Sequence, residues 1–188
     1  MQKILDHIAN VVRPALRNYC EAEKELTEAV KSKDLDAIAT ARQKATLAAR
    51  QAATELHHFT DFVFKEKAPP LAFATLDAVR GAVEAKCVLL RTATPIPDVS
   101  LLRDVADAFK HHHLDRQSAT IAASTDVVSM GTGFGEVAYY GEGKYGGMEQ
   151  FIITKKDGQK RALSSVLQDV FDAWMTLLGQ PLPPMSVF

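Results

Sequence analysis

Residues 1–64 carry helical periodicity along almost their whole length, and this feature constrains the fold more than any other. Over residues 4–29, apolar side chains recur at spacings of three and four, which places them on one side of a helix. A short polar break follows at residues 31–34, and the next apolar pattern predicts a second helix over residues 35–64. Because the break is short, the two helices are predicted to form an antiparallel hairpin. At about 1.5 Å per residue, each arm would be roughly 40–45 Å long.

Two features of this hairpin bear on its packing. Pro14 either kinks the first helix or lies in the first turn of a shorter helix that begins there. Alanine dominates the apolar face of the second helix, so a neighbouring backbone can approach closely. That face consists of Ile38, Ala41, Ala45, Ala48, Ala49, Ala52, Leu56, Phe59 and Val63. The long arms and the apolar tail at Met185, Val187 and Phe188 supply more apolar surface than one small core covers, so we expect a homodimer or larger homo-oligomer.

Two shorter helices are predicted next. Thr75 is expected to cap a third helix, whose apolar stripe includes Cys87 and Leu90. After a proline-containing loop, Ser100 is expected to cap a fourth helix that reaches about Leu114. The two helices extend the bundle that the hairpin begins.

The pattern changes after residue 116. Glycines gather between residues 131 and 147, and β-branched residues gather at 120–128 and 151–154. The second of these runs leads to Asp157-Gly158, a dipeptide that favours a tight turn, and this combination predicts a β-hairpin.

The last predicted helix begins near Ser165, whose spacing to Gln168 fits a capping box. Gly179 is expected to end it. Its apolar stripe consists of Val166, Leu167, Val170, Phe171, Trp174, Leu177 and Leu178. We expect this helix to pack back onto the bundle through Trp174.

Together these elements predict a predominantly α, α+β fold. Residues 1–116 form an antiparallel helical bundle, residues 117–162 form a small Gly-rich antiparallel β segment, and residues 163–188 form a closing C-terminal helix and tail. A chain of 188 residues is long enough to bury one core without disulfides or metals. We therefore expect a single domain.

Composition limits the partners and the compartment. With 22 Lys+Arg against 23 Asp+Glu, the net charge of −1 does not support nucleic acid as a partner, although a local basic patch stays open. No apolar stretch approaches the ~20 residues that cross a membrane, so no membrane partner is expected. Cys20 and Cys87 fit neither a disulfide framework nor a metal knuckle, which favours a cytoplasmic location.

A cluster of histidines at the end of the fourth predicted helix is the main candidate site. Projection on a helix places His112 and His113 on the apolar arc and His111 on the opposite side, four residues after Asp107. In one interpretation, His111 pairs with Asp107 at the surface, and the other two histidines lie at the edge of the core. In the other, His112 and His113 line a crevice beside Arg116 that takes an anion or a metal. We predict a polar ligand-binding pocket of His111, His112, His113 and Arg116, gated by the Gly-rich loop, whose charge changes near pH ~6–7.

A second, weaker candidate is a metal site at His57 and Asp61, which are four residues apart and can face one point. In an up-down-up-down bundle, the second and fourth helices end together. The pair would then meet His112 and His113 around a metal ion.

The segments Asp107–His111 and Leu114–Arg116 resemble a set of uncharacterised bacterial helical-bundle proteins with a late Lys-His pair. Lys110-His111, Gly158 and Trp174 match that outline. More distantly, the chain is similar to HEPN-type bundles, which carry an Arg-Asn-x-x-x-His ribonuclease motif. The corresponding residues 106–111 keep the histidine and replace Arg with Ala and Asn with Asp. The resemblance implies RNA processing, and the replaced Arg is the cation expected to stabilise the transition state.

No general acid–base pair, nucleophile triad or cofactor fingerprint is present in the sequence. The pattern therefore favours a regulatory module that binds a small ligand or a partner. An HEPN-like RNA-processing protein is the first alternative, and a metal-dependent enzyme with a His/Asp site in the bundle is the second. The sequence identifies no cofactor.

Overall fold

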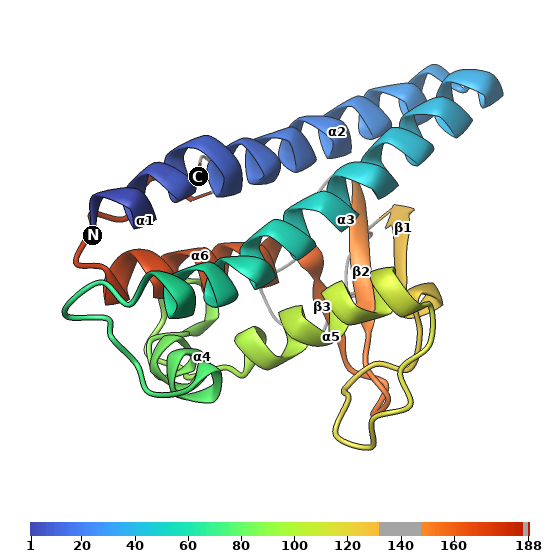
Figure 1. Ribbon diagram of the computed structural model, residues 1–188. Coiled ribbons are helices and arrows are strands. Elements are labelled where there is room, and N and C mark those ends of the chain that lie inside the picture. The colour runs from blue at the N-terminus through green and yellow to red at the C-terminus, as the bar shows by residue number, and fades with distance from the viewer. Residues whose placement is uncertain (132–147, 186–187) are drawn as a thin grey trace.

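In the computed structural model, which describes residues 1–131, 148–185 and 188, helices make up most of the molecule and a small antiparallel sheet lies at one end of them (Figure 1). The predicted fold class is confirmed. None of the helices in the described part of the chain is long and apolar enough to span a membrane. The elements in chain order are α1 (Gln2–His7), η1 (Ile8–Val12), α2 (Arg13–Ser32), α3 (Leu35–Glu66), α4 (Leu76–Glu84), η2 (Leu89–Arg91), α5 (Asp98–His111), η3 (Ser124–Asp126), β1 (Val127–Gly131), β2 (Glu149–Thr154), β3 (Lys160–Ala162) and α6 (Leu163–Leu177).

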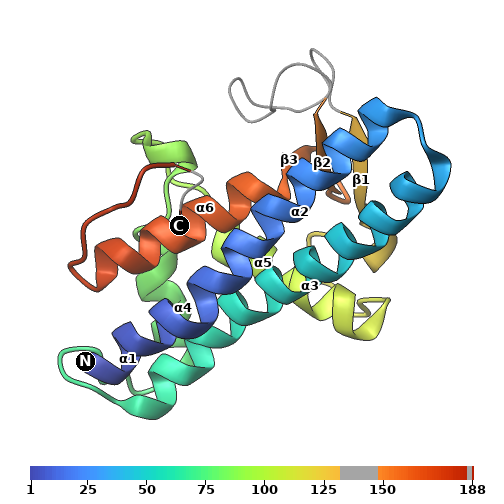
Figure 2. The same ribbon diagram turned by 90° about the horizontal axis from the view of Figure 1, so that it is seen from above.

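Helices α2 and α3 form the predicted antiparallel hairpin. Lys33 takes a left-handed conformation with φ 61° and ends α2. Asp34 then caps α3, because its carboxylate accepts hydrogen bonds from the amides of Asp36 and Ala37 at 3.0 and 3.2 Å. Both views of the ribbon show this turn extending beyond the sheet (Figures 1 and 2).

Pro14 lies in the first turn of α2, the second of the two predicted alternatives. The turn before it, η1, is a π-helix in which the amide of Arg13 donates to the carbonyl of Ile8. Val12 and Arg13 both have right-handed helical φ and ψ, so the helix runs through this point and Pro14 lacks only the N–H that would continue its hydrogen-bond ladder. The wider π turn carries the chain from α1 into α2 without a sharp kink.

The closing helix α6 packs on the hairpin as predicted. The Trp174 ring meets the ring of Phe59 in α3 edge-to-face, with 4.7 Å between centroids, and both side chains are buried. Residues from α2, α3, α5 and α6 thereby share one core.

The sheet has the order β1-β2-β3, with both pairs antiparallel. The predicted hairpin turns at Asp157-Gly158, where Gly158 has φ 82°. On the stretch of β2 that β3 does not reach, α2 supplies the hydrogen-bond acceptors. The Glu23 carboxylate accepts from the amide of Phe151 at 3.2 Å, and the Thr27 hydroxyl accepts from the amide of Glu149 at 3.1 Å.

The third predicted helix is shorter than expected. Helix α4 ends at Glu84, so Cys87 and Leu90 lie beyond it. The amide of Ile96 donates to the Cys87 carbonyl at 3.2 Å, so this stretch pairs with the returning chain instead of continuing the helix.

Two predicted caps are wrong. Helix α5 begins at Asp98, before Ser100, and the Glu84 carboxylate of α4 accepts from the amide of Val99 at 3.0 Å in that first turn. Helix α6 begins at Leu163 directly after β3, so the capping box between Ser165 and Gln168 does not form. A strand that runs straight into a helix leaves no loop in which a polar cap can be placed.

A buried ion cluster joins four of these elements. Arg161 of β3, which is 0% exposed, donates to both oxygens of Asp98 in α5 at 2.9 and 2.8 Å and to Asp169 in α6 at 3.2 Å. Asp169 also accepts from the amide of Leu90 in η2 at 2.7 Å. Burial raises the pKa of Asp98, and it raises the pKa of Asp169 to about 8.

Candidate anion-binding groove

Helices α3 and α5 run in opposite directions (Figure 1). The nine-residue α4 between them is too short to span the bundle, so α5 begins near the end of α3 and runs back along it. The expectation that these helices end together is therefore wrong. The cavity beside His113 includes neither His57 nor Asp61, and the described residues contain no group of three or more metal-binding side chains in a suitable arrangement.

The histidine cluster lies outside the core. Helix α5 ends at His111, and His112 follows with φ 63°, so the helical projection does not apply to His112 or His113. All three histidines are exposed, and the expected burial of two of them is wrong. His112 has its Nδ1 3.4 Å from the hydroxyl oxygen of Ser124, and the backbone of His113 forms an isolated bridge with Ala123.

A cavity of about 470 Å³ opens at the C-terminal end of α5. Of the four residues predicted for the polar pocket, His111, His113 and Arg116 border this cavity. His112 does not border it, and ligand binding at this pocket stays a prediction. The glycine-rich loop that was expected to gate it lies at residues 132–147, outside the described residues.

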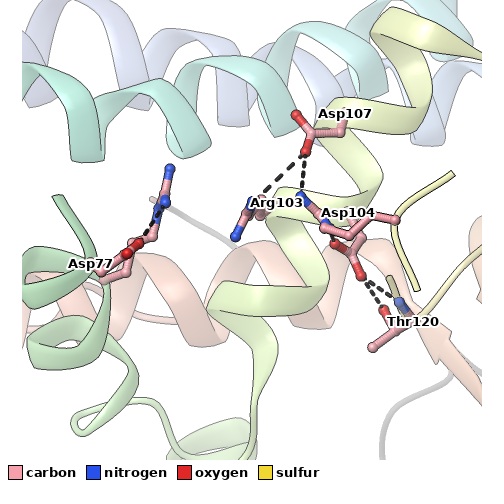
Figure 3. A network of polar contacts seen from close by, with 7 residues as sticks. Asp77, Arg103, Asp104, Asp107 and Thr120 are labelled. Atoms are coloured by element: carbon pink, nitrogen blue, oxygen red, sulfur yellow. Dashed lines mark hydrogen bonds and ion pairs between the residues drawn. The ribbon is translucent and has the colours of Figure 1, made fainter. Parts of the chain in front are cut away.

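Arg116 ties the chain after α5 back onto that helix through Asp104 and Asp107, which Figure 3 shows on α5. Its guanidinium donates to the buried Asp104 and, at 3.3 Å, to Asp107. Asp104 also accepts from the amide and hydroxyl of Thr120 at 2.5 and 2.8 Å. Asp107, which was considered as a partner of His111, instead has Arg103 at 3.8 Å on its other side.

A second cavity of about 350 Å³ forms a groove between α3 and α5, and Asp107 borders both cavities. The residues that line the groove are Arg50, Thr54, His57, His58, Ala106, Asp107, Phe109 and Lys110. Arg50 lies over the ring of Phe109 at 5.9 Å, an arrangement that links the two helices.

Sequence reasoning selected His57 from this groove and missed Arg50 and Thr54. A signal for them was present, because Arg50, Thr54 and His57 follow the i, i+4, i+7 spacing of one helix face. These polar residues adjoin the alanine-rich face of α3, which packs closely against its neighbours. Polar side chains at the edge of such a face come close to the next helix.

The groove holds fixed positive charge beside a neutral imidazole. Burial lowers the pKa of His57 to about 4, with His58 and Arg80 adding to the effect and Asp107 opposing it. Arg50 of α3 and Lys110 of α5 supply the positive side chains of the groove. Among the described residues, the buried Nε of Arg80 has no hydrogen-bond partner, although its Nη1 donates to Asp77 at 2.9 Å.

Comparison of the chain with protein-family models, with curated proteins and with solved structures finds no match. What the groove can bind is therefore inferred from the residues that line it. Arg50 and Lys110 supply cationic donors from two helices, and Thr54 supplies a hydroxyl. The neutral His57 can donate one N–H without adding charge. This set is suited to holding an oxyanion.

Proposed function

We propose that the protein is a binding module for a small phosphorylated ligand, held in the groove between α3 and α5. The observation that carries this proposal is the pair of permanent cations, Arg50 and Lys110, that border one groove from different helices. Arg donates in a fork that matches phosphate oxygens, and Lys acts as a point charge beside it. The carboxylate of the groove, Asp107, already has Arg116 and Arg103 beside it, so its negative charge is largely offset.

A regulatory role follows from where the groove lies. Lys110 is in the last turn of α5, and the chain from His112 to β1 is fastened to the same helix by Arg116. A ligand that links α3 to the end of α5 stabilises one position of this segment. The near-neutral net charge supports a small ligand over a long polyanion, because a polyanion depends on a broad positive field.

Arg50→Gln tests the proposal by removing one cation without creating a large cavity. We expect inorganic phosphate and pyrophosphate to bind the native protein, and the substitution to lower affinity by about tenfold or more, since a charge-assisted hydrogen bond contributes roughly 1.5–3 kcal/mol. Isothermal titration calorimetry at pH 7 measures the change. Arg42→Gln is the matched control, because Arg42 is exposed on the same helix and does not line the groove.

Proton NMR of the His57 imidazole, followed as phosphate is added, gives an independent measurement of anion binding in the groove. A bound anion favours the protonated imidazole, so phosphate should raise the His57 pKa from its value of about 4. Equal affinities of the native protein and Arg50→Gln would contradict the proposal. So would the absence of phosphate and pyrophosphate binding at millimolar concentrations.

RNA cleavage is the second candidate function, and the adjoining cavity favours it. The sequence replaces the arginine of the HEPN-type motif with Ala106, but Arg116 borders the same cavity as His111. A cation from another segment thereby stands near the histidine. His111→Ala should lower cleavage of single-stranded RNA by roughly 100-fold, as expected for loss of a general acid or base.

His112→Ala is the control for this second test, because His112 is exposed and adjacent but does not line the cavity. Fluorescence of a dual-labelled RNA measures the rate. Cleavage that survives in His111→Ala, or its absence in the native protein, removes this candidate and leaves the phosphate-binding proposal in place.

A further inference from the structure

A third cavity of about 350 Å³ lies between the N-terminal helices and the C-terminal end of α6, and it shares no residue with the anion-binding groove. It is bordered by α1, η1, α2, the last turn of α6 and the chain that follows. The lining residues are Leu5, Ile8, Ala9, Arg13, Arg17, Met175 and Gln180. These residues combine an apolar floor with two guanidinium groups, and no carboxylate is among them.

The apolar part of the cavity is formed by Ile8 and Met175, which are both buried, and by the half-buried Leu5. The π-helical turn places a cation next to this floor. The hydrogen bond from the Arg13 amide to the Ile8 carbonyl spans one π turn, and both residues line the cavity. Single π turns are rare in helices and are frequent at functional sites.

Arg13 is available to a ligand. Its guanidinium carbon lies 5.5 Å from the centroid of the Phe171 ring, a cation–π contact that uses none of its N–H donors in a hydrogen bond. Within the described residues, the structure gives Arg13 no hydrogen bond or ion pair. Its neighbour one turn later, Arg17, shows what such a group binds at this surface.

Phe188 is the residue that Arg17 binds. The main-chain carbonyl oxygen of Phe188 accepts from Nε and Nη2 of Arg17 at 3.1 and 2.9 Å. Its ring is buried and meets the ring of Phe171 edge-to-face, 5.6 Å between centroids. This surface therefore already holds an apolar group with an oxygen acceptor on an arginine. The cavity repeats the same combination at Arg13.

We infer that the third cavity binds a small carboxylate that carries an apolar chain. The carboxylate pairs with the guanidinium of Arg13, with the side-chain amide of Gln180 nearby, and the chain lies against Leu5, Ile8 and Met175. A carboxylate matches the planar fork of an arginine, and burial of the apolar chain adds affinity in proportion to its area. The inference does not depend on the proposed phosphate site.

Titration with decanoate tests this inference, with the protein labelled on its methionine methyl groups. We expect the Met175 methyl resonance to shift, because Met175 forms part of the cavity floor, while the methionines outside the cavity stay in place. Decanol and decyltrimethylammonium, which have the same chain without a negative charge, should bind at least tenfold more weakly.

Two variants separate the parts of the inference. Arg13→Gln should lower decanoate affinity about tenfold or more, whereas Arg42→Gln should leave it unchanged. Ala9→Phe fills the cavity from an exposed position, so it should abolish the Met175 shift in a folded protein. The inference fails if Met175 does not respond below the micelle concentration, if decanol binds as well as decanoate, or if Arg13→Gln binds decanoate normally. Arg13→Gln and Ala9→Phe should both bind phosphate normally, so failure of the carboxylate site can be told apart from failure of the proposed phosphate site.

Discussion

Replacing Arg161 with methionine is expected to lower the free energy of unfolding by about 3–5 kcal/mol, the largest single effect that the structure indicates. Arg161 is fully buried and bonds to Asp98 and Asp169 at the junction of β3, α5 and α6. Methionine keeps the length and apolar character of the stem but leaves two carboxyl groups without their cation. Removing one partner of a buried ion pair costs more than the pair itself contributes, because the remaining charge has no water.

Urea unfolding measures this loss, and a charge-neutral variant supplies the control. Adding Asp98→Asn and Asp169→Asn to Arg161→Met removes the stranded carboxyl groups, so most of the lost stability should return. A loss below about 1 kcal/mol in the single variant would mean that the cluster contributes little to stability and would contradict this prediction.

The second large effect concerns pH. Burial raises the pKa of Asp169 to about 8, so the folded state keeps a proton that the unfolded state releases near its ordinary value of about 4. The stability that this proton contributes is complete below pH ~4 and is lost as the pH rises to about 8, at roughly 1.4 kcal/mol per pH unit. Native protein should therefore lose stability with rising pH in this window.

His57 acts in the opposite direction over part of the same window. Its pKa is lowered to about 4, so its contribution grows between that pH and about 6.5, where the unfolded imidazole titrates. Asp169 is therefore unopposed by His57 between pH ~6.5 and 8. Urea unfolding across this range should show falling stability in the native protein and a flatter profile in Asp169→Asn. Identical profiles would show that Asp169 titrates near its ordinary value in the folded protein.

The helical part of the fold could be predicted because its signal is local. The α2–α3 hairpin follows from apolar spacing and a short polar break, and the turn at Asp157-Gly158 follows from residue type. The direction of α5 could not be predicted in this way. It depends on where α4 ends, and beyond Glu84 the chain turns back on itself, with the amide of Ile96 donating to the Cys87 carbonyl nine residues earlier, a pairing that apolar periodicity does not report.

The candidate site shows the same division. Three of the four residues predicted for the polar pocket, His111, His113 and Arg116, border a cavity, but the prediction rested on His112 and His113 lying on a buried face. The burial of His112 could not be judged from a projection, because one positive φ takes the chain out of the helix at that residue. Arg50 and Lys110 lie in different helices. The apolar spacing of one helix carries no information about which residues of the other helix face it. Their meeting depends on the antiparallel packing of α3 against α5.

The homo-oligomer stays a prediction.

The alanine face of α3 restricts which substitutions the helix tolerates, and the restriction applies to its buried side and not to its exposed side. Ala45, Ala49, Ala52 and Ala53 are fully buried. A larger side chain at any of them overpacks the core at a cost of typically 1–3 kcal/mol, and glycine loses about 1 kcal/mol of helix propensity. Exposed positions on the same helix, such as Arg42, carry no such restriction. Over many generations α3 would accumulate changes along its outer stripe alone, and a new residue on the inner stripe would persist only with a compensating loss of volume on the helix that it faces.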